Sequence, residues 1–344
     1  MAAGHSVAPG RWQAGLDELL GRVAGRFGRV EPRRRARAFV LGLLAELPRK
    51  NCWTIAEHAG DPSPDGMQHL LARAVWDEDA VRDDVRAYVV EHLADPGAVL
   101  VIDETGDLKK GTTTVGVQRQ YTGTAGRVEN AQVAVYLVYA TGAGHGLIDR
   151  ELYLPRSWTG DPERLQAAGV PDQVGFATKP ELATRMLARA LDAGVPAAWV
   201  TGDEVYGANP GLRGELEARG VGYVLAVACD HRVLVGGVSR RADALLRCVP
   251  ARAWQQVSCG KGAKGHRFYD WAFVRLDDGE PDRGGQAAQR WLLVRRNQKT
   301  RELAFYRCFM PHPVPLATLV RVAGQRWTIE ICQPQCTHMC ELAA

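Results

Sequence analysis

The feature that most constrains the fold is an aliphatic run that ends directly in a carboxylate. Residues 99–102 read Val-Leu-Val-Ile, and Asp103 follows at once. An unbroken aliphatic run is typical of a strand that is buried on both faces of a sheet. Desolvating a carboxylate at the edge of such a strand is costly unless a cation or a donor compensates it. The pattern therefore predicts a central strand with a functional acid, Asp103, at its C-terminal edge.

A second copy of this arrangement lies downstream, where residues 198–202 (Ala-Trp-Val-Thr-Gly) lead into Asp203. If the two strands are neighbours, Asp103 and Asp203 lie side by side. Two converging carboxylates need a divalent metal ion between them, or one of them must stay protonated. Glu104 and Glu204 come next in each copy, and we expect them to point to the opposite side of each strand in a supporting or structural role.

The composition allows several domains and does not by itself identify a function. A chain of 344 residues with 46% hydrophobic and 24% charged residues is long enough for two or three globular domains. The net charge of +4 is compatible with a nucleic-acid partner but is weak evidence alone. Five scattered cysteines read as free thiols, no apolar run reaches membrane-spanning length, and the first residues do not resemble a secretory signal. We expect a cytoplasmic protein.

Residues 1–96 are predicted to form a helical N-terminal domain that binds DNA. Residues 51–60 and 67–74 have helical patterns separated by a turn rich in Asp, Pro, Ser and Gly, which is the outline of a DNA-reading motif. The cluster Arg33, Arg34 and Arg35 could contact phosphates. The alternatives are a plain helical bundle and a solvated basic face. Asp95-Pro96-Gly97 predicts the end of this domain.

Residues 97–228 are predicted to form the first part of an α/β catalytic core. Strands are expected at 99–103, 115–121 and 132–139, then a helix at 179–193, the strand before Asp203, a helix at 210–219 and a strand at 223–227. The order β-β-β-α-β-α-β is that of the ribonuclease H fold, a mixed sheet flanked by helices. In that fold the first and fourth strands are parallel neighbours, as the two aspartates require.

Residues 229–310 are predicted to be a β-rich insertion that is not part of the central sheet. Basic and aromatic residues alternate here, among them Lys264, Arg267, Tyr269 and Trp271. Such mixing suits a surface that holds phosphates and stacks on bases. The alternative is a small β core in which the aromatic side chains only pack, and for any single tryptophan, Trp291 included, packing is the stronger interpretation.

The segment 311–331 is predicted to hold the final helix of the core. Its apolar residues recur at helical spacing from 316 to 330, and Arg326 and Glu330 are four residues apart, so they share one face. The alternative is a surface ion pair on a helix.

Taken together, Asp103, Asp203 and Glu330 resemble the acidic triad of the DDE transposases of bacterial insertion sequences, in the IS701-like branch of the IS4 group. The resemblance covers residues 12–330. It is carried by these words of the sequence: 101–106 (Val-Ile-Asp-Glu-Thr-Gly), 116–121 (Gly-Val-Gln-Arg-Gln-Tyr), 151–155 (Glu-Leu-Tyr-Leu-Pro), 201–207 (Thr-Gly-Asp-Glu-Val-Tyr-Gly), 269–272 (Tyr-Asp-Trp-Ala) and 326–330 (Arg-Trp-Thr-Ile-Glu).

The resemblance implies cleavage of DNA and strand transfer at terminal inverted repeats. It implies two Mg²⁺ ions, with Mn²⁺ able to substitute, held by Asp103, Asp203 and Glu330. Arg326 would contact a phosphate near the scissile bond. Asp107 and Asp270 are weaker candidates for metal ligands. The implied partners are the DNA of the element ends and of the target, with a homodimer on DNA and no membrane, in a nucleoid-associated location.

The sequence after Glu330 departs from the family pattern. Family members continue the helix with an Ala-Lys pair, whereas here Pro334 would interrupt it, and residues 332–344 read as an aberrant tail of a frameshifted or truncated copy. Three functions stay open on this evidence: an active transposase, a truncated DNA-binding remnant that acts as a repressor and cuts poorly, and a general ribonuclease H-like nuclease.

Overall fold

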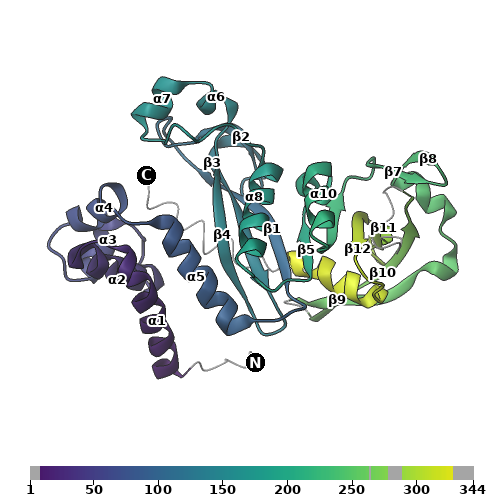
Figure 1. Cartoon of the computed structure of the whole chain (residues 1–344), viewed down its shortest axis with the longest axis horizontal. Coiled ribbons are helices and arrows are strands. Elements are labelled where there is room, and N and C mark those ends of the chain that lie inside the picture. The colour runs from purple at the N-terminus through teal and green to yellow at the C-terminus, as the bar shows by residue number, and fades with distance from the viewer. Residues whose placement is uncertain (1–7, 263–264, 278–288, 328–344) are drawn as a thin grey trace. The chain divides into compact units, whose positions relative to one another are not determined.

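The computed structural model describes residues 8–262, 265–277 and 289–327 (Figure 1). Within them, residues 8–92 form one compact unit and residues 93–327 form another. In the described part of the chain, none of the helices is both long enough and apolar enough to cross a membrane.

The first unit is helical, as the sequence predicts. Its helices are α1 (Pro9–Val23), α2 (Val30–Leu44), α3 (Cys52–His58), α4 (Asp65–Ala72) and α5 (Glu78–Leu93), with a short 3-10 turn, η1 (Ala24–Arg26), after α1. The Asn51 side chain accepts hydrogen bonds from the first backbone N–H groups of α3, which fixes where that helix begins. Ile55 and Met67 are completely buried and hold α3 and α4 against α2.

The predicted succession of helix, turn and helix is present as α3 and α4. Of the basic cluster, Arg33 and Arg34 are exposed on α2. Arg35 instead donates a hydrogen bond of 2.7 Å to Asp61, so it holds the turn between α3 and α4 against α2. Arg35 therefore has a structural contact, and the exposed Arg33 donates only a long hydrogen bond of 3.4 Å to the carbonyl of Phe27.

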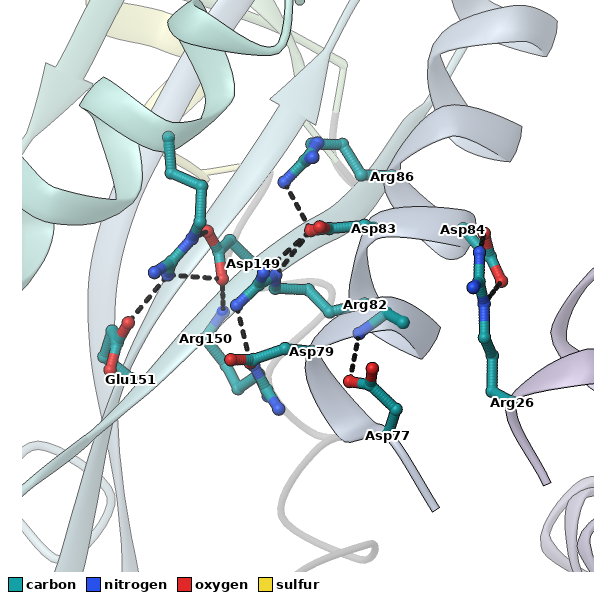
Figure 2. A network of polar contacts seen from close by, with 12 residues as sticks. Arg26, Asp77, Asp79, Arg82, Asp83, Asp84, Arg86, Asp149, Arg150 and Glu151 are labelled. Carbon is teal, nitrogen blue, oxygen red and sulfur yellow. Dashed lines mark hydrogen bonds and ion pairs between the residues drawn. The ribbon is translucent and has the colours of Figure 1, made fainter. Parts of the chain in front are cut away.

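Several arginine–aspartate ion pairs lie at the start of α5 (Figure 2). Arg82 pairs with Asp79 and Asp83 at 2.7 and 2.8 Å, and Arg26 reaches Asp84 with two hydrogen bonds of 2.7 Å. The pair with Arg26 joins η1, the turn after α1, to α5. These acids are therefore occupied by structural contacts within the helical unit.

The second unit is built on a sheet of ten strands in the described part of the chain, with order β2-β3-β1-β5-β6-β12-β11-β10-β9 and β4 paired to β3. The strands are β1 (Val99–Leu108), β2 (Gln118–Thr122), β3 (Arg127–Ala140), β4 (His145–Tyr153), β5 (Trp199–Gly202), β6 (Gly222–Val227), β9 (Gln255–Gly262), β10 (Gly265–Arg275), β11 (Gln289–Arg296) and β12 (Leu303–Met310). A separate hairpin joins β7 (Arg232–Val235) to β8 (Val238–Arg241).

The part β4-β3-β1-β5-β6 has the ribonuclease H topology that the sequence predicts. β1 runs parallel to β5, β5 runs parallel to β6, and β1, β3 and β4 are antiparallel to one another in turn. The assignment of individual strands needs one correction. The third antiparallel strand of the core is β4, which was not predicted. The strand predicted at 115–121 is the short β2, which pairs only with the first residues of β3.

The expectation that residues 229–310 lie outside the central sheet is wrong. The segment is rich in strands, but β12 pairs antiparallel with β6, and β11, β10 and β9 continue the same sheet. Every residue of β6 is buried. An unpaired edge on such a strand would leave buried N–H and C=O groups without partners, and β12 supplies them.

Helices cover both faces of this sheet (Figure 1). On one side lie α8 (Lys179–Asp192), α9 (Glu204–Gly207) and α10 (Pro210–Ala218), and shorter helices α6 (Arg156–Thr159) and α7 (Pro162–Ala167) follow β4. On the other, Leu319 and Val320 of a helix over residues 316–327 pack with Val99 and Val101 of β1. Two 3-10 segments, η2 (Asp243–Cys248) and η3 (Ala251–Ala253), lead into β9.

Candidate metal centre

The two aspartates come together at the end of the parallel pair β1–β5. The register of this pair runs to Ile102 opposite Gly202, so Asp103 and Asp203 are the next residue on each chain. The predicted adjacency of the two strands is confirmed. Carboxylate oxygens of Asp103, Glu104 and Asp203 all lie within 4.8 Å of one another. The sheet therefore gathers three acids at one edge.

Backbone N–H groups fix the orientation of both aspartates. One oxygen of Asp203 accepts a hydrogen bond of 2.8 Å from the N–H of Val205, so Asp203 caps α9 where the chain leaves β5. One oxygen of Asp103 accepts a hydrogen bond of 2.9 Å from the N–H of Glu104. Each carboxylate keeps a second oxygen that these bonds do not use.

Glu104 lies closer to the aspartates than its place in the strand suggested. It alternates to the face of α8 and α9, where its two oxygens accept hydrogen bonds from Lys179 Nζ at 2.8 Å and from Tyr206 Oη at 2.5 Å. Because β5 ends at Gly202, no side chain of that strand separates Glu104 from Asp203. As expected, the Glu104 side chain leaves β1 on the face opposite that of Asp103, but its carboxylate still belongs to the acidic cluster.

Burial and mutual repulsion keep protons on this cluster when no cation is present. Burial, and then the charge of Asp203, raises the pKa of Asp103 to about 7. The pKa of Asp203 is also raised, first by burial and then by the charge of Glu104. Burial and the neighbouring Glu104 likewise raise the pKa of Tyr206, which keeps its hydroxyl a donor. An added positive charge would reverse the first two shifts.

The helix over residues 316–327 brings Arg326 to the same edge of the sheet. Its positive charge lowers the pKa of both Asp103 and Asp203 against the larger effects of burial. Gly324 lets the helix approach the sheet closely, because a Cβ atom there would lie 2.1 Å from the carbonyl oxygen of Cys259. Glu330 and Lys264 of the predicted site lie outside the described residues.

A hollow of about 470 Å³ lies between β6, β12 and this helix, and Arg326 is one of its lining residues. Its lining includes Arg295, Tyr306, Arg326 and Trp327, with Glu204 at one side. Arg295 and Tyr306 were not among the predicted site residues. The apolar runs within β11 and β12 predict strands but do not show on which face of the sheet Arg295 and Tyr306 lie.

The predicted DNA-contacting residues of β10 have different environments. Arg267 and Tyr269 are half-buried, with the Arg267 guanidinium 4.1 Å from the Trp327 ring centroid. Trp271 is completely buried, and its Nε1 donates to the carbonyl of Val257 at 3.2 Å. Trp271 packs on Tyr306 in the core, so the expectation that it contacts DNA is wrong for this residue.

The weaker metal candidates are engaged elsewhere. Asp107 forms a buried ion pair of 2.6 Å with Lys109. Asp270 pairs with Arg296 at 2.9 Å and accepts a hydrogen bond from Gln298. Neither belongs to the described cluster around Asp103.

Comparison with known proteins agrees with this geometry. Residues 22–248 match the family described as DDE superfamily endonuclease. A curated relative, "Probable transposase for insertion sequence element IS701" from Microchaete diplosiphon, is 32% identical over 195 residues, which cover 56% of this chain and 48% of the relative. The chain thus spans about half the length of that relative. The NurA nuclease from Sulfolobus solfataricus overlaps 66% of this chain and 73% of its own at 8% identity with a TM-score of 0.30, which is too low to indicate a shared function.

Proposed function

The chain belongs to the DDE superfamily of endonucleases, and on this premise we propose that it is an insertion-sequence transposase that cleaves DNA at element ends and joins them to a target. The observation that carries the proposal is the approach of the Asp103 and Asp203 carboxylates at the edge of one sheet. The similarity to a probable transposase supports the element end as the substrate.

The residues at this edge fit a hard divalent cation. Carboxylate oxygens are the ligands that Mg²⁺ and Mn²⁺ prefer, and a bound cation would offset the burial and the charge of Asp203 that raise the pKa of Asp103. We propose that Asp103 and Asp203 hold two such ions and that Glu330 completes the set. When bound, the ions supply Lewis acidity for attack on a phosphodiester by water or by a 3′-hydroxyl.

The other residues of the cluster orient and balance the aspartates. Lys179 of α8 and Tyr206 of α9 donate hydrogen bonds to the Glu104 carboxylate. Because Glu104 follows Asp103 directly in β1, these bonds limit the movement of the Asp103 backbone. Arg326 contributes positive charge on the opposite face and is available to a phosphate oxygen. Two element ends must be cut for transposition, which is why we extend the proposal to two copies acting on DNA in the nucleoid.

Cleavage of defined DNA tests the proposal. The purified chain is incubated with Mg²⁺ or Mn²⁺ and with a plasmid that carries the inverted repeats flanking its reading frame, beside a plasmid without them. We expect nicking or strand transfer at the repeat ends, absent in Asp103→Asn. Cleavage without preference for the repeats would favour a general ribonuclease H-like nuclease, and binding to the repeats without any cleavage in either metal would favour a repressor.

A further inference from the structure

Three arginines in or near the hollow between β6 and β12 have a side-chain nitrogen without a hydrogen-bond partner in the described part of the chain. The Nε atoms of Arg267, Arg295 and Arg326 are buried and make no hydrogen bond within the described residues. Arg295 lies 4.0 Å from the carboxylate of Glu302, and that glutamate side chain is 67% exposed. The contrast on the same strand is Arg296, which pairs with Asp270 at 2.9 Å. Burying a guanidinium without a close anion is costly unless a ligand supplies one.

Aromatic rings hold Arg295 in place. Its guanidinium carbon lies 4.7 Å from the ring centroid of Tyr269 and 5.6 Å from that of Trp327. Stacking uses the faces of the guanidinium plane and leaves its N–H edges for acceptors. Arg295 and Arg326 both line the hollow, and the charges of both act on the buried hydroxyl of Tyr306. The hollow therefore has preorganised donors.

We propose that Arg295 binds a DNA backbone phosphate in this hollow, as a second anion contact beyond Arg326. The inference rests on the proposed function, since it takes DNA as the substrate. A fork of N–H groups that lies close to two aromatic rings suits the oxygens of a phosphodiester. The acids that also line the hollow, Glu204 and Glu302, are both exposed, so water screens them more than it screens the half-buried arginines.

Salt-dependent binding of a mixed-sequence, fluorescently labelled DNA duplex, followed by anisotropy in Ca²⁺, tests the contact. We expect Arg295→Gln to flatten the slope of log affinity against log salt by about 0.9, the contribution of one phosphate contact, and to weaken binding about tenfold at low salt. Arg295→Lys keeps the charge and should keep the slope, but it should weaken binding severalfold because lysine cannot present the fork. Arg296→Gln, from the next residue of β11, should match the wild-type slope.

The outcomes separate this inference from the function on which it rests. If the wild-type chain binds no DNA, the proposed function itself fails. If the wild-type chain binds and Arg326→Gln flattens the slope while Arg295→Gln does not, Arg295 holds no phosphate. Circular dichroism monitors folding of each variant. Should Arg295→Gln not fold, Arg295→Lys decides: wild-type affinity in that variant overturns the inference.

Discussion

Asp103 and Asp203 each come one residue after the last paired residues of the parallel strands β1 and β5, Ile102 and Gly202. The hydrogen-bond ladder of β1 and β5 sets the separation of their backbones, so the site does not depend on a loop. Just beyond, β5 ends and α9 begins on the Asp203 cap. The two carboxylates thus lie at the end of a buried pair of strands, where the chain of β5 turns away. A cation could reach them there, while the sheet holds their backbones rigidly.

Replacing either aspartate with asparagine should abolish cleavage while leaving the fold intact. Asparagine keeps the shape and the hydrogen bond to the neighbouring N–H, but it removes a charged ligand. We expect Asp103→Asn and Asp203→Asn each to lower plasmid cleavage in Mn²⁺ on the order of a thousandfold. Asp192→Asn, an exposed acid paired with Arg219, serves as the control. Substantial cleavage by Asp103→Asn would remove that residue from the proposed metal site.

The raised pKa of Asp103 makes a prediction for the metal-free protein. The pKa of Asp103 rises from 3.8 to about 7 on folding. Between pH 3.8 and about pH 7 the folded state therefore keeps a proton on Asp103 that the unfolded state has released. Stability from this group is full below pH 3.8 and is lost as the pH rises towards 7. At pH 8 in EDTA, Asp103→Asn should therefore be more stable than wild type, on the order of 2–4 kcal/mol.

Thermal unfolding followed by circular dichroism measures this difference. The gain from Asp103→Asn should shrink as the pH falls from 8 to 5, and adding Mg²⁺ should stabilise the wild type more than the variant. An equal melting temperature for both proteins across this range would show that Asp103 ionises without a penalty.

The central strands were predictable because their sequences are apolar on both faces. β1 begins with four aliphatic residues, and β5 and β6 are short and mostly apolar; Asp103 directly follows the aliphatic residues of β1, and Asp203 directly follows β5. β4 was missed because Asp149, Arg150 and Glu151 fall within it. That charged run is compatible with a strand only because Arg189 of α8 pairs with Asp149 and Glu151. Such a partner, 38 residues or more away in the sequence, cannot be seen from local patterns.

The candidate site was predictable in its aspartates but not in its surroundings. Strand ends identify Asp103 and Asp203, while the contribution of Glu104 depends on where β5 stops and on Lys179 and Tyr206 from two other helices. The place of β9–β12 was also missed, because a strand-rich segment carries no local signal for the edge with which it will pair. Pairing of β12 with β6 is what brings Arg295 towards the acids.

The hydrogen bond from Tyr206 should matter for activity as well as for stability. Tyr206→Phe removes the donor to Glu104 and leaves a buried carboxylate with one fewer partner, at a cost of about 1–3 kcal/mol in the free energy of unfolding. Because Glu104 then moves more freely beside Asp203, we expect cleavage to fall about tenfold or more. Urea unfolding measures the loss of stability, and cleavage assays in Mn²⁺ measure the loss of activity.

Tyr223→Phe is the matched control for this experiment. Tyr223 is also buried and donates to a glutamate, Glu217 at 2.7 Å, but it is not part of the acidic cluster. It should lose similar stability and keep its cleavage rate. If both variants lose activity in proportion to stability, Tyr206 has only a structural role.

The Arg189 pairs should be among the strongest polar contributions to the core. The Asp149 side chain is completely buried and accepts two hydrogen bonds from Arg189, at 2.9 and 3.0 Å. Arg189→Met leaves that carboxylate without its cation, so we expect a loss of about 3 kcal/mol in urea unfolding. The double variant Arg189→Met with Asp149→Leu should recover part of the loss, since it also removes the stranded charge. No recovery would argue that packing, and not charge, causes the effect.

Gly324 should control how closely the helix that carries Arg326 approaches the acids. A Cβ atom there would lie 2.1 Å from the carbonyl oxygen of Cys259, which is backbone and cannot turn aside. Gly324→Ala must therefore displace the helix or β9 by a visible amount, although alanine favours the helical conformation by about 1 kcal/mol. A shift of about 1 Å in a positioning group can lower a rate on the order of a hundredfold, so cleavage should fall far more than stability does. Gly214→Ala, within α10, is the control because a Cβ there meets nothing within 4 Å, and it should leave cleavage unchanged. Wild-type cleavage by a folded Gly324→Ala variant would mean that the close contact of this helix with β9 does not position the groups that act on DNA.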